Sequence, residues 1–225
     1  MSQPAQPEHK TVAEYRLLAQ KVLNGGRAAA TNFGDLISRL INLTIAKDSG
    51  HVPVISGSGR LVNIQGWNDA GNAVPLTNGC FLRIAYQVYL SDKDDYLRTA
   101  KNIYQYQTDQ PGKNTWIFRY DYIRKPDDIH PPSHLQIRAN LTESVPVKKN
   151  SLEHVHFPTE RVSIEAILRL LINDFDVPCK CKEVLEDETP LWEAVLRATE
   201  APWQDVAHRS TNPSDKRSDP PIPKR

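Results

Sequence analysis

The run from Gly79 to Leu90 constrains the fold more than any other part of the chain. Apolar residues occupy every second position, at Cys80, Leu82, Ile84, Tyr86, Val88 and Leu90, and the positions between them include Arg83 and Gln87. Because side chains alternate across a strand, this period predicts a long β-strand with one apolar face. We therefore expect a sheet that buries one of its faces.

Further strands are predicted on both sides of this run, at residues 61–66, 96–107, 116–123 and 133–141. Turn-forming residues separate them, with Asp, Asn, Gly and Pro concentrated at 68–79, 91–95 and 109–112. Consecutive strands joined by short turns are typical of an antiparallel meander of about five strands.

Helical periodicity appears before and after the predicted sheet. Residues 12–23 and 33–44 form two apolar stripes, and we expect Asn32 to cap the second helix, with Asp35 in its first turn. Residues 164–175 carry the best amphipathic pattern, with Ser163 as the expected N-cap and Glu165 in the first turn. A last helix is predicted at 190–200. The chain therefore reads as α+β: an antiparallel sheet packed on one face by N-terminal and C-terminal helices.

Composition limits the class of protein. The chain has 225 residues, a formal net charge of +1 and three cysteines. No apolar run is long enough to cross a bilayer, no secretory signal is visible, and three cysteines cannot make a disulfide framework. We therefore expect a cytoplasmic protein with no contact to a membrane, and near-neutrality argues against a bulk nucleic-acid coat.

One domain is expected over residues 10–208. It comprises a helical pair at 10–47, a sheet at 59–141 and helices at 163–200. Residues 1–9 and 209–225 are rich in proline and poor in apolar side chains, so we predict that both ends are disordered. The C-terminal tail is basic and can contact nucleic acid or an acidic partner, or it can serve solubility alone.

The polar face of the predicted sheet is the main candidate for a functional site. Its expected members are Arg83, Gln87, Arg119, Asp121, His134, Gln136 and Arg138. If their strands are neighbours, several guanidinium groups converge, and guanidinium binds phosphate in a bidentate manner. His134 beside Asp121 is a candidate general acid or base, which together with Arg119 and Arg138 would suit metal-independent phosphodiester chemistry.

Two other interpretations stay open. An antiparallel sheet with one wet face normally alternates apolar and polar residues, so the same arginines and Asp121 can be cross-strand ion pairs. Arg161 can form a ladder with Glu165 and Arg169 on an exposed helix face, or it can reach the sheet site as a phosphate clamp.

Metal and cofactor chemistry finds less support in the sequence. His130, His154 and His156 are candidate zinc ligands, but their spacing matches no standard zinc motif. There is no G-x-G-x-x-G fingerprint and no G-x-S-x-G elbow, so we expect no dinucleotide cofactor and no serine nucleophile.

The segments FRYDY at 118–122, HPPSHLQIRANL at 130–141 and VHFPTERVSIEAILRLLINDF at 155–175 together resemble TumE-type toxin proteins of bacterial toxin–antitoxin pairs. The resemblance extends over residues 80–175. It implies a bacterial cytoplasmic protein that acts on RNA or nucleotides, and it adds Tyr120 and Tyr122 to Asp121 and His134 as site residues.

Two functions are therefore expected. The first is a toxin- or defence-type protein that acts on RNA or nucleotide phosphates through the Arg, His and Asp side chains of the sheet. The second is a non-enzymatic module that docks a protein partner within such a system.

Overall fold

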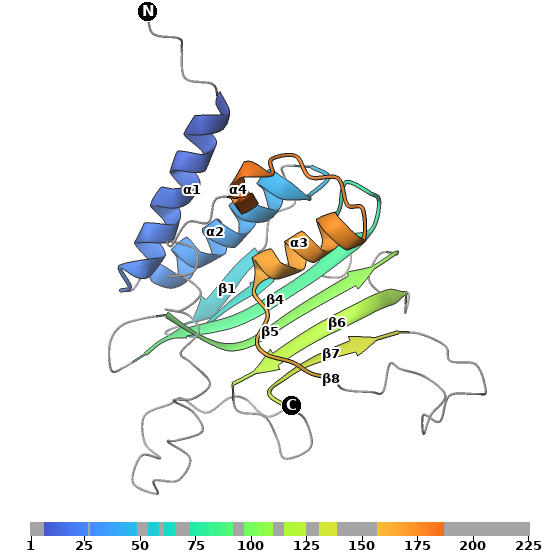
Figure 1. Cartoon of the computed structure of the whole chain (residues 1–225). Coiled ribbons are helices and arrows are strands. Elements are labelled where there is room, and N and C mark those ends of the chain that lie inside the picture. The colour runs from blue at the N-terminus through green and yellow to red at the C-terminus, as the bar shows by residue number, and fades with distance from the viewer. Residues whose placement is uncertain are drawn as a thin grey trace, which may run out of the picture.

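The computed structural model describes residues 7–26, 28–48, 54–58, 61–65, 73–91, 97–109, 115–124, 131–138 and 157–186. Its helices are α1 (Pro7–Leu23), α2 (Ala29–Thr44), α3 (Ile164–Asp174) and α4 (Glu183–Glu186). All four lie on the same side of a single sheet (Figure 1). The fold is therefore α+β with helices on one sheet face, as the sequence predicts.

The sheet has eight strands, all paired in the antiparallel sense. They are β1 (Val54–Ser58), β2 (Leu61–Gln65), β3 (Ala73–Pro75), β4 (Phe81–Leu90), β5 (Leu97–Gln107), β6 (Trp116–Ile123), β7 (Ser133–Ile137) and β8 (Phe157–Pro158). The order across the sheet is β1-β2-β4-β5-β6-β7-β8, and β3 pairs with β4 beside β2. The predicted meander is confirmed, with β4 and β5 at its centre.

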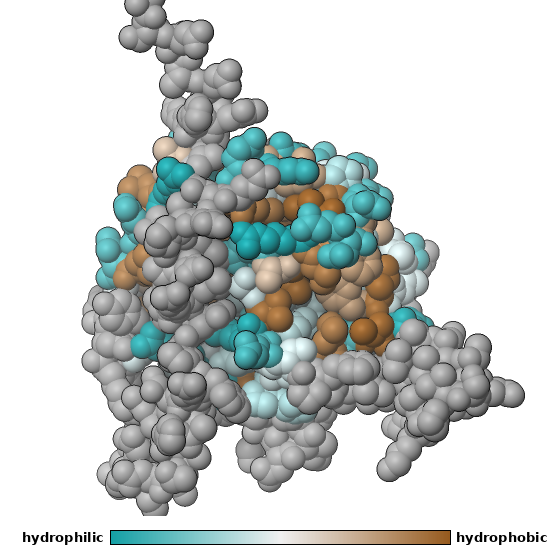
Figure 2. All heavy atoms as spheres, in the orientation of Figure 1, coloured by the Kyte–Doolittle hydropathy of each residue, from teal (hydrophilic) through white to brown (hydrophobic). Residues whose placement is uncertain are grey.

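The alternation in β4 divides the sheet into two faces. Leu82, Ile84, Tyr86 and Val88 are buried against the helices, on what we call the inner face. The intervening positions, including Arg83 and Gln87, belong to the opposite, outer face. In Figure 2, apolar side chains gather in the band between the helix layer and the sheet, while hydrophilic ones cover the outward surface of the helices.

The helices form because each presents apolar side chains to the core: α2 packs on the sheet, and α1 and α4 pack against α2. In α2 these side chains include Phe33, Leu36, Ile37 and Leu40, all buried, and the Phe33 ring meets the Tyr86 ring edge-on at 5.4 Å between centroids. Such edge-to-face contacts add to the stabilisation that burial itself provides. These contacts fix α2 on the inner face above β4.

Helix boundaries test the predicted caps. Ser163 caps α3 as predicted, because its Oγ accepts a hydrogen bond from Ala166 N at 3.1 Å, and Glu165 lies in the first turn. The prediction for α2 was wrong: the cap residue is Ala28, and Asn32 lies inside the helix. The preceding alanines favour the helix and place its cap four residues N-terminal of Asn32.

The N-terminal helix also starts earlier than expected. It begins at Pro7, inside the segment 1–9 that we expected to be disordered. Proline is well suited to the first turn of a helix. An N–H group at that position would have no intrahelical acceptor, so its absence costs no hydrogen bond. The predicted helix at 190–200 and the tail at 209–225 lie outside the described residues.

Three strands were not predicted. β1 contains Gly57 and two serines, β3 ends on Pro75, and β8 has only two residues, so none shows a clear alternating pattern. Tertiary pairing rather than local propensity makes them strands. Within the described residues, no helix is long and apolar enough to cross a membrane.

Candidate anion-binding site

The register of four neighbouring strands brings polar residues into one line on the outer face. Arg83 of β4 pairs with Gln105 of β5, Gln105 pairs with Arg119 of β6, and Arg119 pairs with Gln136 of β7. Neighbouring strands lie about 4.8 Å apart, so the two arginines are separated by about 10 Å along this arginine–glutamine row. All four side chains are half-buried.

A second row lies beside the first. In it Ala85 pairs with Ile103, Ile103 with Asp121, and Asp121 with His134. The strands carrying Arg83, Asp121 and His134 are therefore adjacent members of one sheet, which is what a shared site requires. The sequence alone could place each residue on its strand but not the strands beside one another.

Asp121 joins the two rows through Arg119. The Arg119 Nε lies 2.7 Å from Asp121 Oδ2, and its Nη2 donates to Oδ1 at 2.9 Å, which makes a bidentate ion pair. The Asp121 side chain is 7% exposed and that of Arg119 is 29% exposed. Asp121 therefore holds the Arg119 guanidinium in a fixed orientation on the outer face.

His134 is an internal part of the sheet. Its side chain is 6% exposed, its Nδ1 lies 3.2 Å from the Pro131 carbonyl oxygen, and its Nε2 lies 3.8 Å from Asp121 Oδ2. Because a carbonyl oxygen can only accept, Nδ1 is the ring nitrogen that carries hydrogen in this contact. The pairing of His134 with Pro158 of β8 covers the far edge of β7.

The remaining residues predicted for this face flank the two rows. Gln87 donates to Asn63 Oδ1 at 3.3 Å and faces Lys101 across β4 and β5. Arg138 follows β7, and its backbone N–H donates to the Ile117 carbonyl at 2.9 Å. The outer face thus presents Arg83, Lys101, Arg119 and Arg138.

Sequence reasoning missed two members of this face, Gln105 and Lys101. Residues 96–107 gave a weak strand signal, and the register shifts at a bulge opposite Gln87 and Val88, so the alternation that would assign faces is interrupted. The one available signal was the presence of Lys101 and Gln105 at alternate positions of the same predicted strand.

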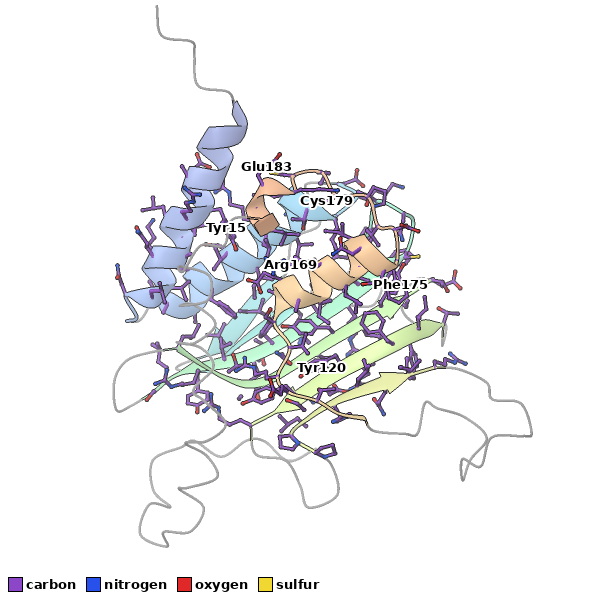
Figure 3. All side chains as sticks on the ribbon, viewed as in Figure 1. Tyr15, Tyr120, Arg169, Phe175, Cys179 and Glu183 are labelled. Atoms are coloured by element: carbon purple, nitrogen blue, oxygen red, sulfur yellow. The ribbon has the colours of Figure 1, made fainter. Side chains whose placement is uncertain are left out.

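The aromatic residues added by the family resemblance lie on the other face. The Tyr120 hydroxyl accepts from Val162 N at 2.8 Å and donates to the Glu160 carbonyl, below α3 (Figure 3). The Arg161 guanidinium lies 4.4 Å from the centre of the Tyr122 ring. Tyr120, Tyr122 and Arg161 therefore belong to the inner face, and the sheet does not bring them together with Arg119 on the outer face.

The predicted ladder of Arg161, Glu165 and Arg169 is also corrected. Glu165 is 6% exposed and faces the protein interior, whereas the Arg169 guanidinium donates to the Leu185 carbonyl. Burial, together with the nearby Glu165 carboxylate, raises the pKa of the Tyr15 phenol well above its ordinary value. Glu165 therefore lies near Tyr15 of α1 and not on an exposed helix face.

Metal binding was the last prediction for this region. His130, His154 and His156 lie outside the described residues. Among the residues that the structure describes, no three His, Cys, Asp or Glu side chains converge as metal ligands do. The three cysteines, Cys80, Cys179 and Cys181, are free thiols.

No protein-family model, no curated protein and no solved structure matches the chain.

Proposed function

We propose that the protein binds the phosphates of RNA or of a nucleotide on the outer face of its sheet. The observation that supports this most directly is the register of the arginine–glutamine row, which aligns Arg83 and Arg119 with amides between and beside them. Guanidinium groups match phosphate oxygens geometrically, and amide side chains donate to phosphate or base edges.

The charge of this face also supports an anionic ligand. The outward positions in the described parts of β4 to β7, together with Arg138, include one acidic side chain, that of Asp121. The basic side chains among them include Arg83, Lys101, Arg119 and Arg138. Asp121 is already matched by Arg119. A local cationic surface of this kind attracts phosphate although the whole chain has a formal net charge of only +1.

The burial of His134 and Asp121 favours binding over catalysis. A general acid or base must come within hydrogen-bond distance of the proton it moves. With 6% and 7% of their side chains exposed, these two residues act as supports for Arg119. RNA is the ligand that the resemblance to TumE-type proteins implies, and in this proposal the protein retains RNA without cleaving it.

The test is a binding titration with labelled single-stranded RNA, measured by fluorescence anisotropy at several salt concentrations. The double variant Arg83→Gln, Arg138→Gln removes two cations and leaves the buried Arg119–Asp121 pair intact. We expect binding to weaken about tenfold or more, and the slope of log K against log salt to fall by about 1.4, since each phosphate contact on a single strand contributes about 0.7.

Arg16→Gln combined with Lys21→Gln is the matched control, because this pair makes the same charge change on the exposed surface of α1, in the helix layer. Its affinity and salt slope should equal those of the wild type. Equal affinity of the double variant and the wild type would refute the phosphate role. RNA cleavage that disappears in a folded His134→Gln variant would establish an enzyme instead.

A docking role through the helix layer has weaker support. The large exposed apolar side chains among the described residues are Leu17, 53% exposed, and Leu170, 36% exposed. Single exposed apolar residues are normal on soluble proteins and do not by themselves mark an interface.

A further inference from the structure

We propose a second binding site, on the inner face of the sheet, that takes a hydroxyl-bearing ligand. Three buried polar atoms carry it: Thr99 Oγ1, Asn102 Oδ1 and Arg124 Nη2, for which the described part of the chain supplies no hydrogen-bond partner. Thr99 is 0% exposed and Asn102 is 1% exposed. Such atoms are rare in folded proteins, because an unpaired buried polar group costs about 1–3 kcal/mol.

A bulge places the two oxygens on the same face. Val88 pairs with Thr99 and Gln87 with Lys101, so Ala100 is the extra residue on β5. Thr99 and Asn102 therefore take successive inward positions, although two residues separate them in sequence. Without the bulge, one of the two would face outward.

Arg124 completes the group from the neighbouring strand. Its backbone N–H donates to the Ala100 carbonyl at 2.9 Å, and its Nε donates to the Thr99 carbonyl at 2.8 Å. These two bonds hold the guanidinium beside Thr99 and leave Nη2 as a donor that still needs an acceptor.

Tyrosines border the site on the sheet. Asn102 pairs with Tyr86 on one side and with Tyr122 on the other, and its Nδ2 donates to the Tyr104 hydroxyl at 3.3 Å. The Tyr104 hydroxyl in turn bonds to that of Tyr86. The Asn102 amide is thereby held in place through its Nδ2, and its Oδ1 accepts no hydrogen bond from the described residues.

The chemistry of the three atoms defines the ligand class. Two oxygens need donors and one guanidinium N–H needs an acceptor, and a hydroxyl group supplies both functions. Ordered water and a small polyol share this chemistry. The site is neutral at its two oxygens and has one guanidinium, so it requires no acidic ligand.

The first test compares Thr99→Val with Thr44→Val. Thr44 is equally buried, but its hydroxyl donates to the Leu40 carbonyl at 2.8 Å, so its loss removes a bond within the protein. If a ligand hydroxyl bonds to Thr99, the isosteric Thr99→Val should lower the thermal midpoint by about 2–4 °C, as Thr44→Val does. An unchanged or higher midpoint for Thr99→Val would overturn the proposal.

A crystal structure of the wild-type protein, determined once from plain buffer and once with glycerol as the probe, provides the second test. Density within hydrogen-bond distance of the three atoms supports the site. A single oxygen in both crystals identifies water, and glycerol density in the second identifies a polyol. Absence of any density at the three atoms in both crystals would refute it.

Discussion

The ion pair between Asp121 and Arg119 gives the sharpest prediction about the outer face. Asp121→Asn keeps the shape of the side chain but removes its charge, and it leaves one carbonyl oxygen where two carboxylate oxygens now meet Arg119 at 2.7 and 2.9 Å. The variant therefore keeps part of one bond and loses the charge that matches the guanidinium.

The expected loss of stability follows from the exposure of the two partners. Removing one member of a fully buried pair costs about 3–5 kcal/mol, because it leaves an uncompensated charge in the interior. Arg119 is 29% exposed and can regain part of its hydration, so we expect the free energy of unfolding to fall by about 2 kcal/mol. For a chain of this length that corresponds to a drop of about 4–8 °C in the thermal midpoint.

Urea unfolding followed by circular dichroism measures this effect, and the protein supplies its own control. Arg39 and Glu14 form an ion pair on the helices whose side chains are 37% and 43% exposed, so Glu14→Gln should cost less than about 1 kcal/mol. A double-mutant cycle with Arg119→Gln isolates the coupling, expected at about 1–2 kcal/mol. The reasoning fails if Asp121→Asn and Glu14→Gln cost the same, or if the cycle shows no coupling.

Three further predictions concern the helix layer and the sheet end. Ser163→Ala removes the cap of α3 and should lower the free energy of unfolding by about 1 kcal/mol in the same urea assay, whereas Ser163→Asp should retain it. Burial, together with contact to Glu183, raises the pKa of the Cys181 thiol to about 11, so iodoacetamide should modify it far more slowly at pH 8 than a model peptide thiol, with the rate rising toward pH 11. Burial raises the pKa of Tyr106 from 10.0 to about 12, so the unfolded chain releases its proton first and stability should fall from pH 10 toward 12; Tyr106→Phe should make that fall shallower in a series of urea titrations.

The sequence was a good guide wherever one period ran without interruption. The alternation in 79–90 predicted β4, and the apolar stripe of 164–175 predicted α3 together with its Ser163 cap. It failed where pairing rather than pattern makes the structure. β8 has two residues and lies next to β7 although 19 residues separate them in sequence, and no local propensity signals such a contact.

The candidate site shows the same limit at the level of single residues. The polar face was predicted correctly for Arg83, Arg119 and Gln136, because each lies at an alternate position of a regular strand. The role expected of His134 depended on its exposure, and its side chain is only 6% exposed. Position within a strand can be derived from sequence, whereas exposure depends on tertiary contacts that the local pattern does not encode.

The two faces of β5 and β6 bring the two proposed sites into close connection. Lys101 and Asn102 are consecutive residues with opposite directions, as are Asp121 and Tyr122. A ligand on the inner face would stiffen the same backbone that carries Arg119, and by linkage any effect on phosphate binding must be reciprocal. The bulge opposite Val88 assigns the neighbouring residues of β5 to different sites. Because of it, Thr99 lies on the inner face and Lys101 lies on the outer face. A change that removes the bulge should therefore disturb both sites.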